Sequence, residues 1–216
     1  GGTTADLLGT GATTQAANTI LRITRSDATT LNRAFTAGST GTLVKTGAGN
    51  LTLGGGFQLL TRNLTVNGGT LTVTGGGFGG NRMDGAGVVT VNSGATLVGA
   101  AGSAHAFGGS DSGMTESFTI NGGTLTLNQE QYFSNLTLNG ATVNGSAEMR
   151  STNATNWAVT GTTTTIVSAR VNQVGTANWN VSDVTASAAE DLIISGQITG
   201  GGALTKTGTG TLRATG

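Results

Sequence analysis

Short runs in which apolar residues alternate with threonine or another small polar residue dominate this chain. They include residues 63–66, 70–73, 88–91, 118–120, 125–127 and 136–138. Alternation with a period of two places one set of side chains in a core and the other in solvent, as in a half-buried β-strand. No stretch shows a sustained helical period with capping residues, and the absence of proline leaves every backbone N–H able to join a β-ladder. The pattern predicts an all-β protein.

Glycine predicts how these strands are separated. If the 39 glycines lay inside strands at a cost of about 0.5 to 1 kcal/mol each, the total would exceed a typical folding free energy of about 5 to 15 kcal/mol. Most of them are therefore expected in turns between short strands.

A turn unit recurs between the strands: an apolar residue, an asparagine, a small turn and a second apolar residue. The asparagines are Asn67, Asn92, Asn121 and Asn139, at intervals of 18 to 29 residues. This recurrence predicts successive coils of a solenoid from about Asn50 to Val181, with each coil burying its apolar face against its neighbours. We expect the four asparagines to occupy equivalent turns, at least some of them stacked, because asparagine tolerates left-handed backbone and its amide can bond between coils.

An antiparallel meander or sandwich is the alternative fold, because Asn-Gly followed by alternating apolar residues is also a β-hairpin signal. Three of the four units have a step of three or more residues where a hairpin needs a tight two-residue loop. The solenoid is therefore favoured.

A second repeat pairs residues 41–51 with residues 202–212, and seven of these eleven positions are identical. The shared pattern, L-x-K-T-G-x-G-x-L, resembles the autotransporter-associated β-strand repeat of passenger domains in bacterial type V secretion. The resemblance implies a right-handed parallel β-helix on the outside of a Gram-negative-type cell. The second copy departs from the family at Arg213-Ala214, where the family usually continues with Thr-Leu.

Composition excludes several functional classes. Only 9% of the 216 residues are charged, and ten basic residues balance ten acidic ones, so the chain lacks the basic face that nucleic-acid binding requires. Without cysteine, a disulfide scaffold and a cysteine-based zinc site are excluded. The apolar runs, such as 191–195, are much shorter than the roughly 18 to 20 residues of a membrane span.

Three stretches contain residue types used in catalysis or metal binding. His105 lies in a Gly/Ala/Ser segment, 99–117, with Ser103, Ser110, Asp111, Ser112 and Glu116, but the spacing does not match a known triad and predicts an exposed loop. Residues 76–84 fit a single copy of a calcium-binding nonapeptide, whereas calcium needs six to eight oxygen ligands from adjacent copies. A flexible glycine-rich loop is favoured there.

Polysaccharide-cleaving β-helices use paired carboxylates, and the chain offers few candidates. Glu190 and Asp191 are neighbours, so in a strand they would point to opposite faces. Glu130, Glu148 and Asp183 are interpreted as isolated, surface-solvating residues. No catalytic, cofactor-binding or metal site is expected, no cofactor is implied, and the protein is predicted not to be an enzyme.

Two other residue types suggest binding. Trp157 and Trp179 are 22 residues apart and could stack in neighbouring coils, where core packing is favoured over sugar binding. The Thr-x-Thr step at 70–74 would suit an ice-binding face if it recurred in every coil. It recurs only at Thr124–Thr126, so outward threonines in their ordinary role are favoured.

Residues 1–216 are thus expected to form a single β-solenoid segment, a fragment of a longer repetitive surface protein with a structural or adhesive function. Its expected partners are other copies or flanking repeats end to end, as in a filament, and host or matrix glycans, but not nucleic acid. Neither 1–11 nor 203–216 carries a capping pattern, so both ends are expected to be open. The alternative function is an extracellular carbohydrate-active β-helix that binds or cleaves polysaccharide.

Overall fold

The computed structural model describes residues 13–32, 41–54, 63–74, 87–100, 105–107 and 117–216. All regular structure within these ranges is β. The first ten strands are β1 (Ile20–Ile23), β2 (Thr29–Leu31), β3 (Thr42–Lys45), β4 (Asn50–Leu53), β5 (Asn63–Val66), β6 (Gly69–Val73), β7 (Val88–Asn92), β8 (Ala95–Gly99), β9 (Ser117–Asn121) and β10 (Thr124–Leu127). The remaining ten are β11 (Gln131–Asn139), β12 (Thr142–Asn144), β13 (Glu148–Thr160), β14 (Thr165–Val167), β15 (Arg170–Asn172), β16 (Thr176–Val181), β17 (Leu192–Ile194), β18 (Ile198–Thr199), β19 (Leu204–Thr207) and β20 (Leu212–Ala214).

The strands form two parallel sheets. The first has eleven strands, in the order β1-β3-β5-β7-β9-β11-β13-β15-β18, with β16 paired to β13 and β19. The second has nine, in the order β2-β4-β6-β8-β10-β12-β14-β17-β20. Each strand pairs with one from the next coil, not with its neighbour in sequence. The antiparallel alternative is therefore wrong; among the described residues only an isolated bridge between Asn92 and Gly122 is antiparallel.

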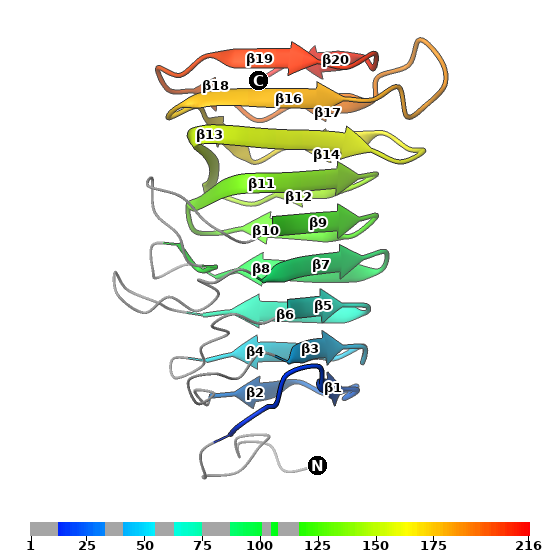
Figure 1. Ribbon diagram of the computed structural model, residues 1–216, viewed down its shortest axis with the longest axis vertical. Coiled ribbons are helices and arrows are strands. Elements are labelled where there is room, and N and C mark those ends of the chain that lie inside the picture. The colour runs from blue at the N-terminus through cyan, green and yellow to red at the C-terminus, as the bar shows by residue number, and fades with distance from the viewer. Residues whose placement is uncertain (1–12, 33–40, 55–62, 75–86, 101–104, 108–116) are drawn as a thin grey trace.

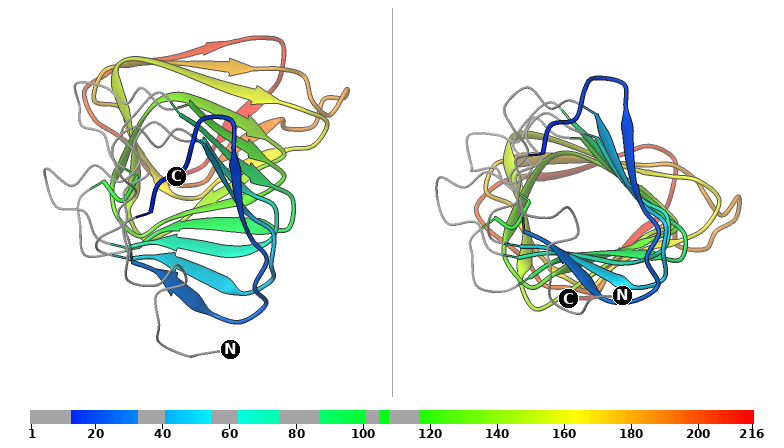
Figure 2. Two further views of the ribbon diagram at one scale, coloured as in Figure 1. Left: turned by 60° about the horizontal axis from the view of Figure 1, so that its bottom comes forward. Right: turned by 90° about the horizontal axis from the view of Figure 1, so that it is seen from below.

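The chain climbs as a right-handed β-solenoid, as the sequence predicted (Figure 1). Strands β1, β3, β5, β7 and β9 run in one direction in front, as do β16 and β19, and the strands of the second sheet return behind. The views from below show the same winding around one interior (Figure 2). The coils extend beyond the predicted range of Asn50 to Val181, from β1 to β20.

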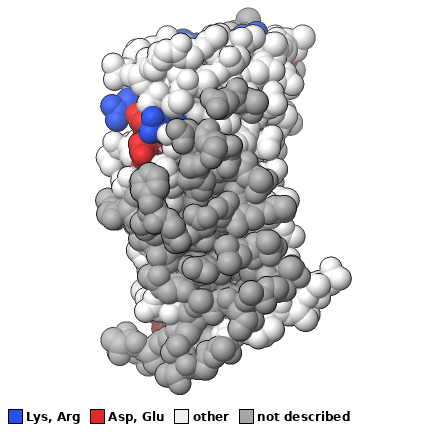
Figure 3. Space-filling model, turned by 60° about the vertical axis from the view of Figure 1, so that its left-hand side comes forward, with Lys and Arg blue, Asp and Glu red and all other residues white. Residues whose placement is uncertain are grey.

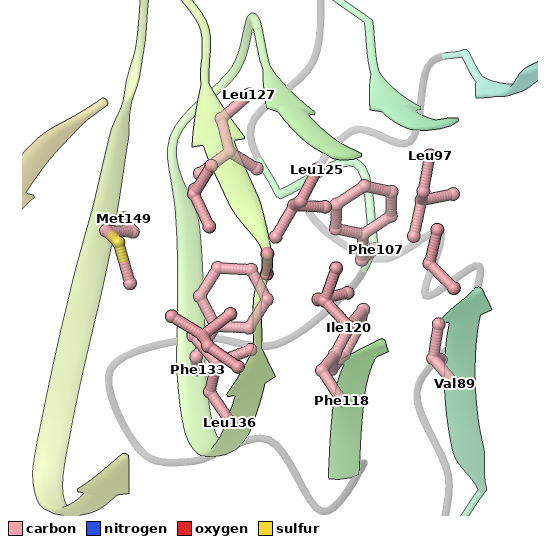
Figure 4. Close-up of a cluster of buried hydrophobic side chains, with 14 of the residues drawn as sticks. Val89, Leu97, Phe107, Phe118, Ile120, Leu125, Leu127, Phe133, Leu136 and Met149 are labelled. Carbon is pink, nitrogen blue, oxygen red and sulfur yellow. The ribbon is translucent and has the colours of Figure 1, made fainter. Parts of the chain in front are cut away.

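The interior is a stack of apolar side chains, one layer from each coil. One column of buried residues joins Leu43, Leu64, Val89, Phe118, Leu136, Trp157 and Trp179 in register. Figure 4 shows the middle of the core, where Phe107, Phe118 and Phe133 lie among leucines from both sheets. Burial of each such side chain contributes about 1.5 to 3 kcal/mol, so the stack is the main source of stability.

The predicted asparagine turns are equivalent and stacked. Asn92 and Asn139 are each in register with Asn121. Asn92 Nδ2 donates to Asn67 Oδ1 at 2.6 Å, and Asn121 Nδ2 donates to Asn92 Oδ1 at 3.2 Å. The amides therefore form a short ladder along the corner between the two sheets.

A third side of the solenoid is built from strand segments beginning at β11. Residues 131–133 of β11 pair with 149–151 of β13, whose first residues pair with β15, and β15 pairs with β18. The later residues of β11 and β13 remain on the side formed by β1, β3, β5, β7 and β9, and this side continues through β16 and β19. This third side positions the charged cluster described next.

Candidate functional site

Charged side chains gather on the third side of the solenoid (Figure 3). Arg150 lies between two carboxylates from neighbouring coils: its Nη1 is 2.9 Å from Glu130 Oε2, and its Nε is 3.4 Å from Glu148 Oε1. Arg170 Nε is 2.9 Å from Glu148 Oε2, and Asn172 Nδ2 donates to Glu148 Oε1 at 2.9 Å. We call Glu130, Glu148, Arg150 and Arg170 the ion network.

The expectation that Glu130 and Glu148 are isolated residues is wrong. Parallel stacking of β13 on β11 brings them beside the same arginine, and β15 adds Arg170 in register with Glu148. The sequence signal for this was the acid-x-arginine pair at 148–150, whose members point to the same side of a strand. Asp183 is exposed, as expected.

His105 and Tyr132 border the ion network. His105 Nε2 lies 3.3 Å from Glu130 Oε1, and its ring meets the Tyr132 ring edge-on at 5.0 Å. The Arg150 guanidinium stacks over Tyr132 at 4.8 Å. His105 has a left-handed backbone, with φ of 58°. Two residues on, Phe107 is buried, and its N–H donates to Gln131 Oε1 at 2.9 Å. The expectation of an exposed loop is therefore wrong at residues 105–107, because Phe107 packs into the core.

The chemistry of this cluster is that of a structural salt bridge. Each carboxylate forms an ion pair with at least one guanidinium, and Asn172 also donates a hydrogen bond to Glu148. Both acids are therefore neutralised by basic side chains of the protein itself. The cluster ties together strands from three consecutive coils. In part-buried surroundings such a network stabilises more than separate exposed pairs, which contribute about 0 to 1 kcal/mol each.

The other predicted candidates fall into two groups. Ser103, Ser110, Asp111, Ser112 and Glu116, like the calcium-type segment 76–84, lie outside the described residues. Glu190 and Asp191 are described and do point to opposite faces, because Asp191 is fully buried whereas Glu190 reaches the surface and pairs with Arg213 at 2.8 Å. The described residues contain no group of three or more histidines and acids that could hold a metal ion.

Asp191 is a buried carboxylate whose role sequence reasoning missed. Its Oδ1 accepts from the N–H groups of Val184 and Thr185, both at 2.8 Å, and from Thr185 Oγ1 at 3.0 Å. Its Oδ2 accepts from the N–H of Thr211, in the next coil, at 2.7 Å. Burial by itself would raise the pKa of Asp191, but the hydrogen bonds from Thr211, Thr185 and Val184 outweigh it and lower the pKa. The carboxylate anchors the loop that projects between β16 and β17.

The two tryptophans lie in register in neighbouring coils, both buried, with ring centroids 4.6 Å apart in an edge-to-face arrangement. Trp157 Nε1 donates to the Phe133 carbonyl at 3.1 Å. The favoured interpretation, core packing, is confirmed.

The two copies of the L-x-K-T-G motif lie at the same corner, between the first and second sheets. Lys45 Nζ donates to the carbonyl of Gly47 at 2.5 Å, and Lys206 Nζ donates to the equivalent Gly208 at 2.8 Å. Buried Lys45 also donates to Gly68 of the next coil at 2.7 Å, whereas Lys206 is exposed. Burial lowers the pKa of the Lys45 ammonium. The lysine therefore caps the corner and, in the first copy, joins two coils.

The two copies differ in register. Lys206 pairs with Trp179, which belongs to the column of in-register residues that begins at Leu43. Lys206 therefore aligns with Leu43, whereas its counterpart in the motif, Lys45, lies two residues further along β3. Sequence identity thus locates the corner but not the register.

Comparison with protein-family models, curated proteins and solved structures gave no match. Among the described residues, no helix has the length and hydrophobicity needed to cross a bilayer.

Proposed function

We propose that this chain is a structural segment of a bacterial cell-surface protein of the autotransporter-passenger type, a rigid extracellular shaft that displays adhesive parts. The observation that carries this proposal is the uninterrupted coil-to-coil pairing from β1 to β20. Solenoids of this kind are quasi-one-dimensional, so each added coil adds length without needing a larger core. Flanking coils or other copies, stacked end to end, and matrix glycans are the partners in this proposal.

Hydrogen bonds between consecutive coils support a structural, load-bearing role. Buried Lys45, Asp191 and the asparagine ladder each bond between consecutive coils. These contacts resist sliding or separation of coils, as a shaft requires. The motif that resembles the autotransporter-associated repeat supplies the first of them.

A carbohydrate-active β-helix is the second candidate, favoured by one observation. Glu130 and Glu148 come from neighbouring coils and share Arg150 on one side of the solenoid. Carboxylates at the side of a β-helix are the groups that glycoside cleavage would use.

The test is to fuse the chain, with an epitope tag at its N-terminus, to the translocator barrel of an unrelated autotransporter in a Gram-negative host. We expect the tag to be detected on intact cells and the segment 117–181 to resist added protease. Retention inside the cell, or rapid proteolysis within these strands, would contradict the proposal. Release of reducing sugar from polysaccharide by the purified chain, abolished in Glu130→Gln or Glu148→Gln, would establish the second candidate instead.

A further inference from the structure

The outer face of the second sheet carries threonines in two columns along the solenoid. Thr70, Thr96, Thr124 and Thr142 lie in register in four consecutive coils. Beside them runs a second column with Thr30, Thr52 and Thr72 in register. Val98 takes the next position of this column, and Thr126 the one after it. Sequence spacing concealed this order, because Thr96 and Thr142 belong to no Thr-x-Thr step.

This threonine face is uncharged. None of the strands β2, β4, β6, β8, β10, β12, β14 and β17 contains Lys, Arg, Asp, Glu or an aromatic residue. By contrast, the ion network lies on the third side. Hydroxyl and methyl groups therefore set the chemistry of the threonine face.

The array is regular and preorganised. Neighbouring strands of a sheet are about 4.8 Å apart, and residues two apart along a strand are separated by about 6.6 Å, so the hydroxyls occupy a two-dimensional grid. Threonine is stiff at χ1, and Thr72 and Thr126 are fixed further by bonds to Asn50 at 3.0 Å and Asn144 at 2.8 Å. In the first column the threonines are partly exposed and their hydroxyls bond no described residue, which leaves them available to a partner.

We infer that the threonine face binds the surface of ice. A rigid, neutral grid of hydroxyl and methyl groups suits a solid whose own hydrogen-bonding groups repeat along two directions, because little conformational entropy is lost on contact. A sugar chain is disfavoured, since these strands offer no aromatic ring for stacking and both tryptophans are buried. This inference goes beyond the proposed shaft, which does not require it.

The experiment is partitioning into slowly growing ice, followed by an assay of ice recrystallisation. We expect the wild-type chain to be enriched in ice and the double variant Thr96→Lys/Thr124→Lys to lose the enrichment about tenfold, equivalent to about 1.4 kcal/mol. The matched control is Thr90→Lys/Thr119→Lys, which places the same charges in the same coils on the outer face of the first sheet and should retain enrichment. Circular dichroism and melting temperature establish that each variant is folded.

If the lysine pair at 96 and 124 unfolds the chain, Thr96→Ala/Thr124→Ala removes the same hydroxyls with less perturbation and should also reduce enrichment. Exclusion of the wild type from ice overturns the inference, as does an equal loss in the first-sheet control. Retention of the wild type on crystalline cellulose or chitin without enrichment in ice also overturns it, in favour of a glycan surface. None of these results bears on surface display, which is measured separately.

Discussion

At the scale of single residues, Asp191 shows how one buried polar group holds a corner of the solenoid. Its two oxygens accept four hydrogen bonds, three of them from backbone N–H groups. Removal of the carboxylate leaves these donors without their acceptor. The Val184 N–H is buried, and the Thr185 and Thr211 bonds are part-buried. The cost of each buried unsatisfied group is about 1 to 3 kcal/mol.

We expect Asp191→Ala to lower the free energy of unfolding by about 3 kcal/mol or more, measured by urea denaturation at neutral pH. Exposed Asp183→Ala is the control and should change it by less than about 0.5 kcal/mol. Similar losses of stability in the two variants would contradict the stabilising role assigned to the hydrogen bonds of Asp191.

The pH dependence of this contribution follows from the lowered pKa of Asp191. The unfolded state takes up the proton first as the pH falls, so the stabilisation is complete above the unfolded pKa of about 4 and is lost as the pH falls through the lower folded pKa. The difference in stability between wild type and Asp191→Asn should therefore be constant from pH 7 to 5 and shrink below pH 4. If the difference in stability grew on acidification, the pKa of Asp191 would be raised in the folded state, not lowered.

Gly145 is a second residue on which a corner depends. Its φ is 126°, and a Cβ built there would lie 2.1 Å from the Leu127 carbonyl oxygen of the preceding coil. Gly145→Ala should destabilise by more than about 1 kcal/mol, whereas Gly201→Ala, where a Cβ meets nothing within 4 Å, should stabilise by about 0.4 to 1 kcal/mol. Thermal melts of the two variants measure the contrast.

At the scale of elements, the lysine corner joins strands that sequence analysis recognised only as a repeated motif. Lys45 reaches the carbonyls of Gly47 and Gly68, and so connects β3 to the turn between β5 and β6. The same residue type at 206 makes the local bond and lies exposed. Lys206 is therefore a natural control for the contact between Lys45 and Gly68.

We expect Lys45→Met to destabilise by about 1 to 3 kcal/mol, because two carbonyls lose a donor, and Lys206→Met to change stability by less than about 0.5 kcal/mol. Chemical denaturation of both variants compares them directly. Equal effects would mean that the contact with Gly68 contributes nothing.

At the scale of the whole molecule, stability is a sum of coils and of interfaces between neighbouring coils. Leu125, in β10, has coils on both sides and is fully buried, whereas Leu204, in β19, is 37% exposed. Stability should therefore be greatest in the middle of the stack.

Leu125→Ala should lower the free energy of unfolding by about 2 to 5 kcal/mol through the cavity it leaves, and Leu204→Ala should have a much smaller effect. Hydrogen exchange should likewise show amides of β9 and β10 exchanging more slowly than those of β19, since local opening is easiest where contacts are fewest. Uniform protection over all strands would indicate a single cooperative unit instead.

The sequence by itself determined the fold class and its inward-facing residues. Alternation with a period of two depends only on neighbouring residues, so it identified strands such as β5 and β6 and the buried side of each. Recurrence of the asparagine turn required one corner per coil, and the stacked amides of Asn67, Asn92 and Asn121 follow from that.

Only the tertiary structure decided how one coil lies on the next. Variable loops between coils hide the register, so the two-residue offset of Lys206, the meeting of Glu130 and Glu148 at Arg150, and the alignment of Thr96 with Thr70 and Thr124 could not be read along the chain. Their physical origin is parallel pairing. It places residues 18 to 29 positions apart side by side, in a register set by packing of the shared core.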